Sequence, residues 1–436
     1  MEALGSDPSV DVAMLQQFKR GQAVRSGAPR GMEGLQIMAE ATLQARTRGH
    51  PHLITLVVAA AVGTLALTMF IPSMPGMAEA FGTSYSTVQL ALSLYLFMTA
   101  LVQLACGPLS DLYGRRPVMI AGMGLFVAGT VICLLAPTIE WLLVGRVVQA
   151  ASATGLILSR TIIRDLYERD KAASMIGYTV MAMAVAPMVG PWLGGLLEEA
   201  IGWRGTFYAL LAVGIASLAL VQFDLGETNR TAGQPVRAQL ASYRTLVSTP
   251  AYWVFVGAGS FASAVFFGFL GGAPKLADVA LQMSPASYGA WFAFCAAGYA
   301  VGNFVSGRFA ERVGLARMIL VGAMLSLSGP AAIALSFAVG WNAPFALFGW
   351  IALTGVGNGM VLPSNVAGAI SIRPDAAGAA SGLLGTLQTM TGALASVVAA
   401  WAVGDGTRAL PFALVLLGAG LIGLVFAALC GRALRQ

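Results

Sequence analysis

Charged residues are scarce in this chain of 436 residues. Asp, Glu, Lys and Arg together make up 10% of it, while hydrophobic residues make up 57%. Soluble domains carry about 25% charged residues. Because a soluble fold cannot hide so large an apolar fraction, the composition excludes an ordinary soluble domain and indicates a membrane protein.

Histidine and cysteine are also few. The two histidines, His50 and His52, precede the first long apolar run, and the four cysteines have no metal-ligand spacing. The sequence contains no nucleotide-binding loop, metal-binding cluster or nucleophile elbow. These absences argue against an enzyme and predict neither a metal nor a cofactor, and the cysteines are interpreted as small packing residues without disulfides.

Twelve apolar runs are long enough to cross a bilayer, since a spanning helix needs about 20 mainly apolar residues. The runs are 53–72, 87–106, 118–137, 141–160, 175–196, 206–223, 252–272, 289–308, 318–338, 344–363, 378–400 and 411–430. The predicted fold class is therefore an all-α membrane protein with twelve transmembrane helices.

Polar stretches divide the chain into four predicted parts. They are an N-terminal tail at 1–52, a six-helix half at 53–223, a linker at 224–250 and a second six-helix half at 251–436. The tail lacks the features of a signal peptide and is expected to be solvated, apart from a weakly amphipathic piece near 32–43.

The positive charges predict the orientation of the chain. If the N-terminus is cytoplasmic, the outside loops hold only Arg204, Lys275 and Arg408, and the inside loops hold many more Arg and Lys residues. This asymmetry follows the positive-inside rule, so both termini and the linker are predicted to be cytoplasmic. The net charge of +6 is thereby explained by topology, and no nucleic-acid partner is predicted.

One motif occurs twice, 200 positions apart, after the second and the eighth span. Gly, an acid and Gly share the same register in both copies: Gly107, Asp111 and Gly114 in the first, and Gly307, Glu311 and Gly314 in the second. A repeat at this distance indicates two similar halves with a substrate site between them near the middle of the bilayer.

The chemistry of this motif suits a conformational latch. Gly107 permits close approach of a neighbouring helix, and Gly114 permits a tight turn. Asp111 is expected to accept hydrogen bonds from the N–H groups at a neighbouring helix start. Arg115 and Arg116 are expected to anchor in the anionic inner leaflet.

An arginine lies inside the fourth span. Arg146 is followed three positions later by Gln149. Because an arginine in a span costs about 2.5–3.5 kcal/mol on insertion scales, Arg146 is expected to face a cavity. The alternative is a side chain that reaches the outer membrane surface, since Arg146 lies only five residues after Trp141.

Small residues four apart on two spans predict close helix packing. The fifth span contains Gly190, Pro191 and Gly194, and the eighth contains Gly298 and Gly302. We expect these two faces to meet across the halves as a rocking seam, with Pro191 kinking its helix. General membrane-helix glycine is the alternative explanation.

The chain resembles the major facilitator superfamily at these motifs. Residues 88–93, 107–117, 161–167 and 379–388 resemble one subgroup, the bicyclomycin/chloramphenicol-resistance type of drug:proton antiporters. The resemblance implies a multi-pass inner-membrane exporter of small amphiphilic molecules that works by alternating access. It also implies a coupling role for Arg146 and Gln149, and favours efflux because the glycines around Pro191 resemble an antiporter signature.

Two departures from the subgroup bear on coupling. Leu112 replaces a basic residue of the latch signature, and Thr68 stands where such exporters commonly carry an acid. None of the nineteen Asp and Glu residues lies in a span interior. A buried carboxylate is the usual proton carrier of transporters, so its absence argues against strong proton coupling and against cationic substrates.

Seven residues are candidates for the substrate cavity, and each has ordinary packing as its alternative explanation. They are Thr68, Tyr95, Tyr178, Met181, Phe261, Phe266 and Asn358. The expected partners are a small-molecule substrate, the lipid bilayer and, through the resemblance, protons; a monomer is expected. Alternative functions are an exporter or facilitator of a metabolite or siderophore, and a sensor or scaffold that does not transport.

Overall fold

A computed structural model describes residues 51–167, 169–229, 243–373 and 376–434, except for the side chains at 169–170, 172–174, 176–178 and 180–184. The chain divides into a first unit, Met1–Gly49, and a second unit, His50–Gln436. Residues 1–50 of the predicted tail, which include its amphipathic piece, and residues 230–242 of the predicted linker thus lie outside the described residues. All that follows concerns the second unit.

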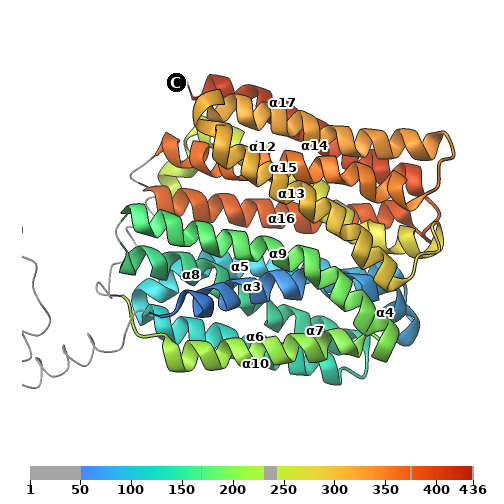
Figure 1. The fold of residues 1–436 in the computed structure, drawn as a ribbon, viewed down its shortest axis with the longest axis horizontal. Coiled ribbons are helices and arrows are strands. Elements are labelled where there is room, and N and C mark those ends of the chain that lie inside the picture. Colours follow the sequence, from blue (N-terminus) through green and yellow to red (C-terminus); the bar gives the residue numbers. More distant parts are fainter. Residues whose placement is uncertain (1–50, 168, 230–242, 374–375, 435–436) are drawn as a thin grey trace, which may run out of the picture. The chain divides into compact units, whose positions relative to one another are not determined.

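The described elements are helices (Figure 1). The N-terminal half contains α3 (Leu53–Thr68), η2 (Ile71–Ser73), α4 (Met74–Ala80), α5 (Tyr85–Tyr113), α6 (Arg115–Leu135), α7 (Ile139–Gln149), η3 (Ala150–Ser152), α8 (Ala153–Leu166), α9 (Arg169–Ile201) and α10 (Arg204–Asp224). The C-terminal half contains α12 (Pro250–Val279), α13 (Pro285–Val313), α14 (Leu315–Ala338), α15 (Pro344–Ile372), α16 (Ala377–Val403) and α17 (Ala409–Ala433).

Every predicted span overlaps one of these helices or a broken series of them. Within the described residues, ten helices are long and apolar enough to cross a membrane, counting α3 to α4 and α7 to α8 as one each. The remaining two expected spans coincide with α9 and α13, which have 33 and 29 residues. The all-helical membrane fold predicted from the sequence is confirmed.

The internal repeat is visible in the geometry of α5 and α13. The Ser84 side chain accepts a hydrogen bond from the Thr87 N–H at the start of α5, and Ser284 accepts one from the Ser287 N–H at the start of α13. Both helices have 29 residues and end at a glycine with positive φ, 99° at Gly114 and 87° at Gly314. Glycine adopts this conformation without strain, as predicted for Gly114.

The helices run roughly parallel to one another, so the bundle has two ends (Figure 1). We call the end with the turns at Gly114 and Gly314 the latch end, and the end with the connections 81–84 and 280–284 the gate end. Contacts between the halves are made mainly by α5 with α16 and by α9 with α13, and at the gate end α12 and α13 also contact η2 and α4.

The buried apolar core differs between the two ends. At the gate end one continuous cluster includes residues from both halves, for example Phe70, Phe126, Phe269 and Phe348. At the latch end each half has its own cluster, around Met123 in the N-terminal half and Phe255 in the C-terminal half. The halves are therefore joined by apolar packing at the gate end.

In two spans the α-helix is interrupted by a short 3-10 helix. The first span breaks after Thr68 into η2 and α4, where Pro72 and Pro75 lie in the first turn of each element. The fourth span passes from α7 to α8 through the short helix η3. Proline cannot donate a backbone hydrogen bond, which accounts for the break in the first span.

Candidate functional site

The two halves touch through backbone at the gate end. A Cβ atom added to Gly195 on α9 would lie 2.2 Å from the carbonyl oxygen of Pro285, and one added to Gly289 on α13 would lie 2.3 Å from that of Pro191. Neither position has room for a side chain, because the opposing atoms belong to the backbone. We call these four residues the gate seam.

Polar contacts between the halves reinforce the gate end. The Tyr85 hydroxyl donates to the Gly271 carbonyl at 3.0 Å. The Gln89 side-chain amide donates to the Ser396 hydroxyl at 3.0 Å, and both residues are buried. Glu199 at the end of α9 accepts from the Ala286 N–H at 3.0 Å. These bonds fix the register of the halves where they meet.

The seam predicted from the sequence has the right helices but largely the wrong glycines. Gly190 and Gly194 face α3, with Thr68 and Met69 as their nearest neighbours. Gly298 and Gly302 face the carbonyl groups of α15. These four glycines therefore pack each half internally, and only Pro191 of the predicted set lies in the contact between halves.

Arg146 is the largest fully buried side chain in the described part of the protein. Its Nε atom donates to the Ala91 carbonyl at 3.1 Å and its Nη1 atom donates to the Ala66 carbonyl at 3.0 Å. The guanidinium carbon lies 4.1 Å from the centre of the Phe70 ring and 4.2 Å from that of Tyr95. Arg146 thus joins α3, α5 and α7 without a carboxylate among the described residues.

This environment corrects the expectation that Arg146 faces a cavity. The side chain is 0% exposed and does not reach the outer membrane surface either. Gln149 accepts from Arg146 through its side-chain oxygen and donates to the Thr130 hydroxyl at 2.8 Å. Cation–π contacts and backbone carbonyls replace the missing counter-ion, which explains how the charge is tolerated inside the N-terminal half.

The first latch motif is held by an ion-pair network within the N-terminal half. The Arg115 guanidinium donates to Asp111 and, at 3.1 Å, to Asp165 at the end of α8. It also donates to the Ser110 hydroxyl at 2.6 Å. Arg115 therefore joins the ends of α5 and α8, and its side chain is only 11% exposed.

The acid at the start of α6 is Glu227, not Asp111. The backbone N–H groups of Arg115 and Arg116 donate to the two Glu227 oxygens at 2.9 and 3.1 Å. The Arg116 guanidinium donates to the carbonyl groups of Gln222 and Leu225. The expectations that Asp111 caps a helix and that both arginines anchor in lipid are wrong, since the end of α10 and the start of the linker occupy these sites.

The second copy of the motif makes fewer contacts. Gly314 forms the expected turn, whereas a Cβ atom added to Gly307 would meet nothing within 4 Å. Glu311 is exposed, and no hydrogen bond or ion pair connects it to the described residues. The two copies therefore share the turn but not the ion-pair network, which belongs to the first copy.

An Asp111→Asn variant is expected to fold and to transport roughly two- to fivefold more slowly, because a partly exposed ion pair contributes ~0.2–1 kcal/mol. Glu311→Gln is the matched control, since this acid stands at the same position of the second copy and makes no hydrogen bond or ion pair with the described residues. The measurement is the initial transport rate of both variants and of the unmodified protein at equal expression. Equal rates for Asp111→Asn and the unmodified protein would contradict a latch role.

The candidate cavity residues are placed mainly inside the two halves. Thr68 bonds to the Thr64 carbonyl, and Tyr95 bonds to the Gly63 carbonyl and the Ser152 hydroxyl. Asn358 joins Ser326 to the Ala262 carbonyl, while Phe261 stacks on Phe426 and Phe266 packs against Phe267 and Phe292. These five make packing contacts within a half, and the side chains of Tyr178 and Met181 lie outside the described residues.

One charged residue of the fourth span was missed from the sequence. Arg160 on α8 is exposed, and it lies within electrostatic range of Tyr299 on α13 of the other half. No hydrogen bond to a described residue engages its guanidinium. Arg160 ends the fourth apolar run and resembles a loop charge in the sequence, which is why composition alone did not single it out.

A family comparison agrees with this architecture. The family model described as Major Facilitator Superfamily matches residues 56–280 of this chain. This chain belongs to the major facilitator superfamily. Members of the superfamily are membrane transporters, which supports a transporter rather than an enzyme.

Named relatives fall in the drug-resistance group expected from the motifs. Multidrug resistance protein D of Escherichia coli is 29% identical over 81% of this chain and 90% of its own length. A chloramphenicol resistance protein of Pseudomonas aeruginosa is 31% identical over 72% of this chain and 74% of its own length. The fold also matches a bacterial homologue of the human lysosomal transporter Spinster, with a TM-score of 0.71 at 17% identity over 87% of this chain and 96% of that one.

Proposed function

We propose that this superfamily member exports small drug-like molecules across a bacterial-type inner membrane by alternating access. The observation that carries the proposal is the asymmetry of the apolar core, which is continuous between the halves at the gate end and divided at the latch end. A transporter closed at one end has this arrangement. Relatives named for multidrug and chloramphenicol resistance support drug-like substrates.

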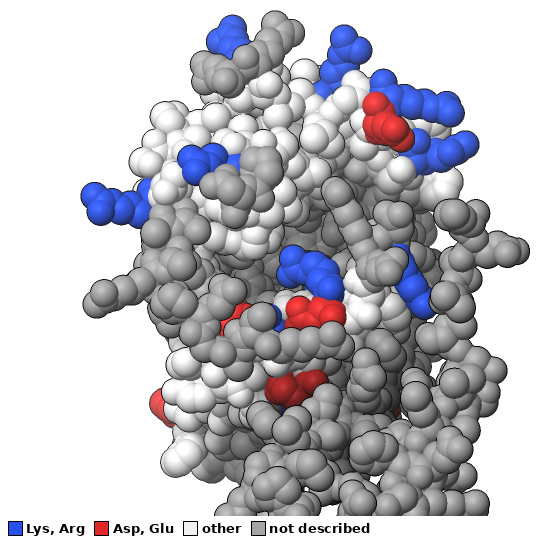
Figure 2. Space-filling model, turned by 90° about the vertical axis from the view of Figure 1, so that its left-hand side faces the viewer, with Lys and Arg blue, Asp and Glu red and all other residues white. Residues whose placement is uncertain are grey.

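The latch end is the cytoplasmic end in this proposal. The arginine asymmetry of the sequence supports this orientation, which makes both termini cytoplasmic. Figure 2 views the latch end and shows Lys and Arg side chains in its upper and central parts, with Asp and Glu side chains near the centre. The structure then corresponds to a state closed toward the outside, and the similar Spinster homologue is described as inward-facing.

In this proposal the substrate binds between the halves, near Arg160 on α8, which lies within electrostatic range of Tyr299 on α13. The span interiors contain no Asp or Glu to attract a cation. A permanently cationic drug would meet repulsion from Arg160 without a compensating carboxylate. We therefore propose neutral or anionic amphiphiles as preferred substrates.

Uptake into inverted membrane vesicles tests this function. Vesicles with the protein should accumulate a neutral or anionic compound faster than a quaternary cation, and faster than vesicles without the protein. Labelling of a Gln436→Cys variant on the outer surface of the same vesicles reports the orientation. Uptake of no compound in the panel would contradict an exporter, and strong uptake of the cation would contradict the proposed selectivity. Repeating the assay with a pH gradient reports proton coupling.

A further inference from the structure

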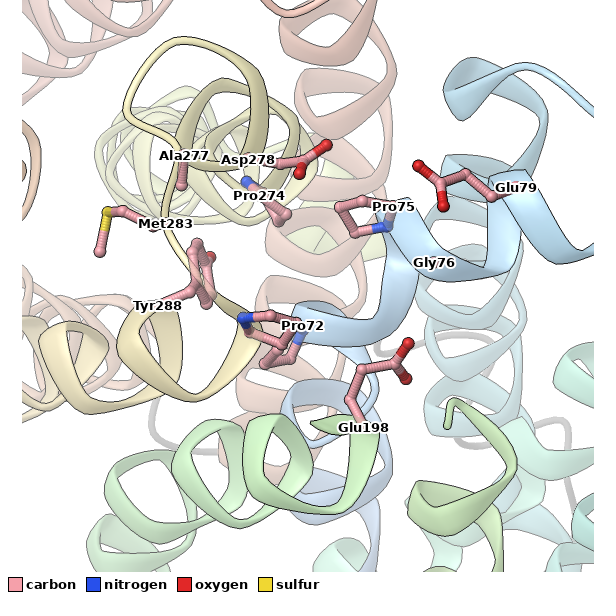
Figure 3. A pocket seen from close by; sticks show the side chains of 11 residues that line it. Pro72, Pro75, Gly76, Glu79, Glu198, Pro274, Ala277, Asp278, Met283 and Tyr288 are labelled. Atoms are coloured by element: carbon pink, nitrogen blue, oxygen red, sulfur yellow. The ribbon is translucent and has the colours of Figure 1, made fainter. Parts of the chain in front are cut away.

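A small pocket lies between the halves at the gate end (Figure 3). Its volume is about 180 Å³. The N-terminal half contributes Glu79 on α4 and Glu198 on α9, and the C-terminal half contributes Asp278 on α12 and Tyr288 on α13. Because both halves supply its walls, this gate pocket exists only while the gate end is closed.

The pocket contains more negative than positive charge. Lys275 forms an ion pair with Asp278 at 3.4 Å, and neighbouring Glu199 accepts from the Ala286 N–H. Glu79 is exposed at the pocket rim. Among the described residues, no Lys or Arg forms an ion pair with Glu198.

Among the acids that line the gate pocket, Glu198 has a carboxylate oxygen that solvent does not reach. Its Oε2 atom has no accessible surface and no hydrogen-bond partner among the described residues. Its Oε1 atom lies against Gly76, where an added Cβ would be 2.3 Å away. An ionised oxygen without water or a donor is costly, so the closed pocket disfavours the charged form.

A second buried polar group in the pocket also lacks a partner. Tyr288 is 2% exposed, and its hydroxyl makes no hydrogen bond with the described residues. In Figure 3 its ring lies beside Pro72 and Pro274, at the contact between the halves. The pocket lining thus combines Glu198 with two further acids, a neutral phenol and proline rings, and the nearby cation Lys275 is paired with Asp278.

We infer that Glu198 is a proton-binding site of the gate, protonated while the two halves are closed around the gate pocket and ionised once they separate. That the gate end faces the outside of the cell rests on the proposed function. The proton comes from the solution at the gate end and returns to it when the pocket opens. This site thereby makes closure of the gate dependent on the pH of that solution.

The direction of the pH dependence follows from linkage. Glu198 lies beyond the apolar run 175–196, and burial raises the pKa of its carboxyl above the ordinary value, while the neighbouring Ser73 hydroxyl acts in the opposite direction. Closure therefore takes up a proton. Acid favours the closed gate, and the closed state loses stability as the pH rises through the raised pKa.

The neighbouring titratable groups are Glu79 on α4, Glu199 on α9, Asp278 and Lys275 on α12, and Tyr288 on α13. Tyr85 on α5 lies within electrostatic range of Tyr288, and its hydroxyl donates a hydrogen bond to the Gly271 carbonyl. Lys275 is engaged by Asp278, and Glu79 and Glu199 are exposed to water. Glu198 is therefore distinguished from the other acids by its buried, unpartnered oxygen.

Distance measurements across the gate test the inference. Spin labels on Ile201→Cys and Ala280→Cys report the separation of the halves, since both positions are exposed and the native cysteines are buried. In the labelled full-length protein without substrate, the short-distance population should grow severalfold from about pH 8 to about pH 5. Glu198→Gln should keep the gate closed at both pH values, because the amide mimics the protonated acid.

Glu199→Gln is the matched control, since it removes the adjacent exposed charge and retains an acceptor for the Ala286 N–H. It should respond to pH like the labelled parent. A pH-independent parent, or a Glu198→Gln variant with an unchanged response, would overturn the inference. If Glu199→Gln lost the pH response, the proton would bind to Glu199 rather than to Glu198, which would also overturn the inference. A normal pH response in a protein that transports nothing would overturn the proposed function and leave this inference standing.

Discussion

A Gly289→Leu variant is expected to insert and fold but to lose most of its transport. A Cβ atom on Gly289 would lie 2.3 Å from the Pro191 carbonyl oxygen and 2.6 Å from the Trp192 Cα atom. Backbone atoms cannot rotate away, so the branched side chain prevents the seam from closing. Overpacking costs about 1–3 kcal/mol, which lowers the closed population about fivefold to about a hundredfold.

The measurements for this variant are vesicle uptake and the distance across the gate. Uptake should fall by about an order of magnitude, and the long-distance population should dominate even in acid. Gly418→Leu is the matched control, because a Cβ atom added there on α17 meets nothing within 4 Å. Normal transport by Gly289→Leu would mean that the gate seam need not close during the cycle.

The second large effect is expected for Arg146→Met. Methionine fills part of the space but leaves the carbonyl groups of Ala66 and Ala91 without the guanidinium and removes the contacts with two aromatic rings. We expect a loss of ~2–4 kcal/mol in the stability of the N-terminal half, together with loss of transport. Thermal unfolding of the purified protein measures the first effect, and vesicle uptake measures the second.

Arg160→Met provides the comparison for Arg146→Met. Arg160 is exposed and makes no hydrogen bond with the described residues, so its removal should leave the melting temperature nearly unchanged. It should instead reduce the preference for anionic over cationic compounds. If Arg146→Met melts like the unmodified protein while Arg160→Met does not, the structural and substrate-facing roles of the two arginines are reversed.

The sequence predicted the fold because its signals are long and redundant. Runs of about 20 apolar residues identify spans almost independently of context. The recurrence of Gly107, Asp111 and Gly114 after 200 positions predicted two related halves, and the capped and terminated helices α5 and α13 repeat the same pattern. The family and the drug-resistance relatives followed from the same motifs.

The details of the site depend on information that a pattern does not contain. Small residues four apart mark a packing face, but Gly190 shows that the partner can be a helix of the same half rather than the opposite one. Likewise, an acid near a helix start predicts a cap, and distant Glu227 took the place expected for Asp111. The rotation of α9 decided the first case, and the position of the residues that follow α10 decided the second. Neither is encoded in local spacing.

The break in the first span also separates the part that stabilises the N-terminal half from the part that lines the gate pocket. Pro72 ends the hydrogen-bond ladder of α3, so η2 and α4 can change tilt while the bonds within α3 persist. The Ala66 carbonyl that holds Arg146 belongs to α3, whereas Gly76 and Glu79 of the gate pocket belong to α4. Substitutions in α4 can therefore alter how fast the gate opens, and at what pH, while the N-terminal half retains its melting temperature.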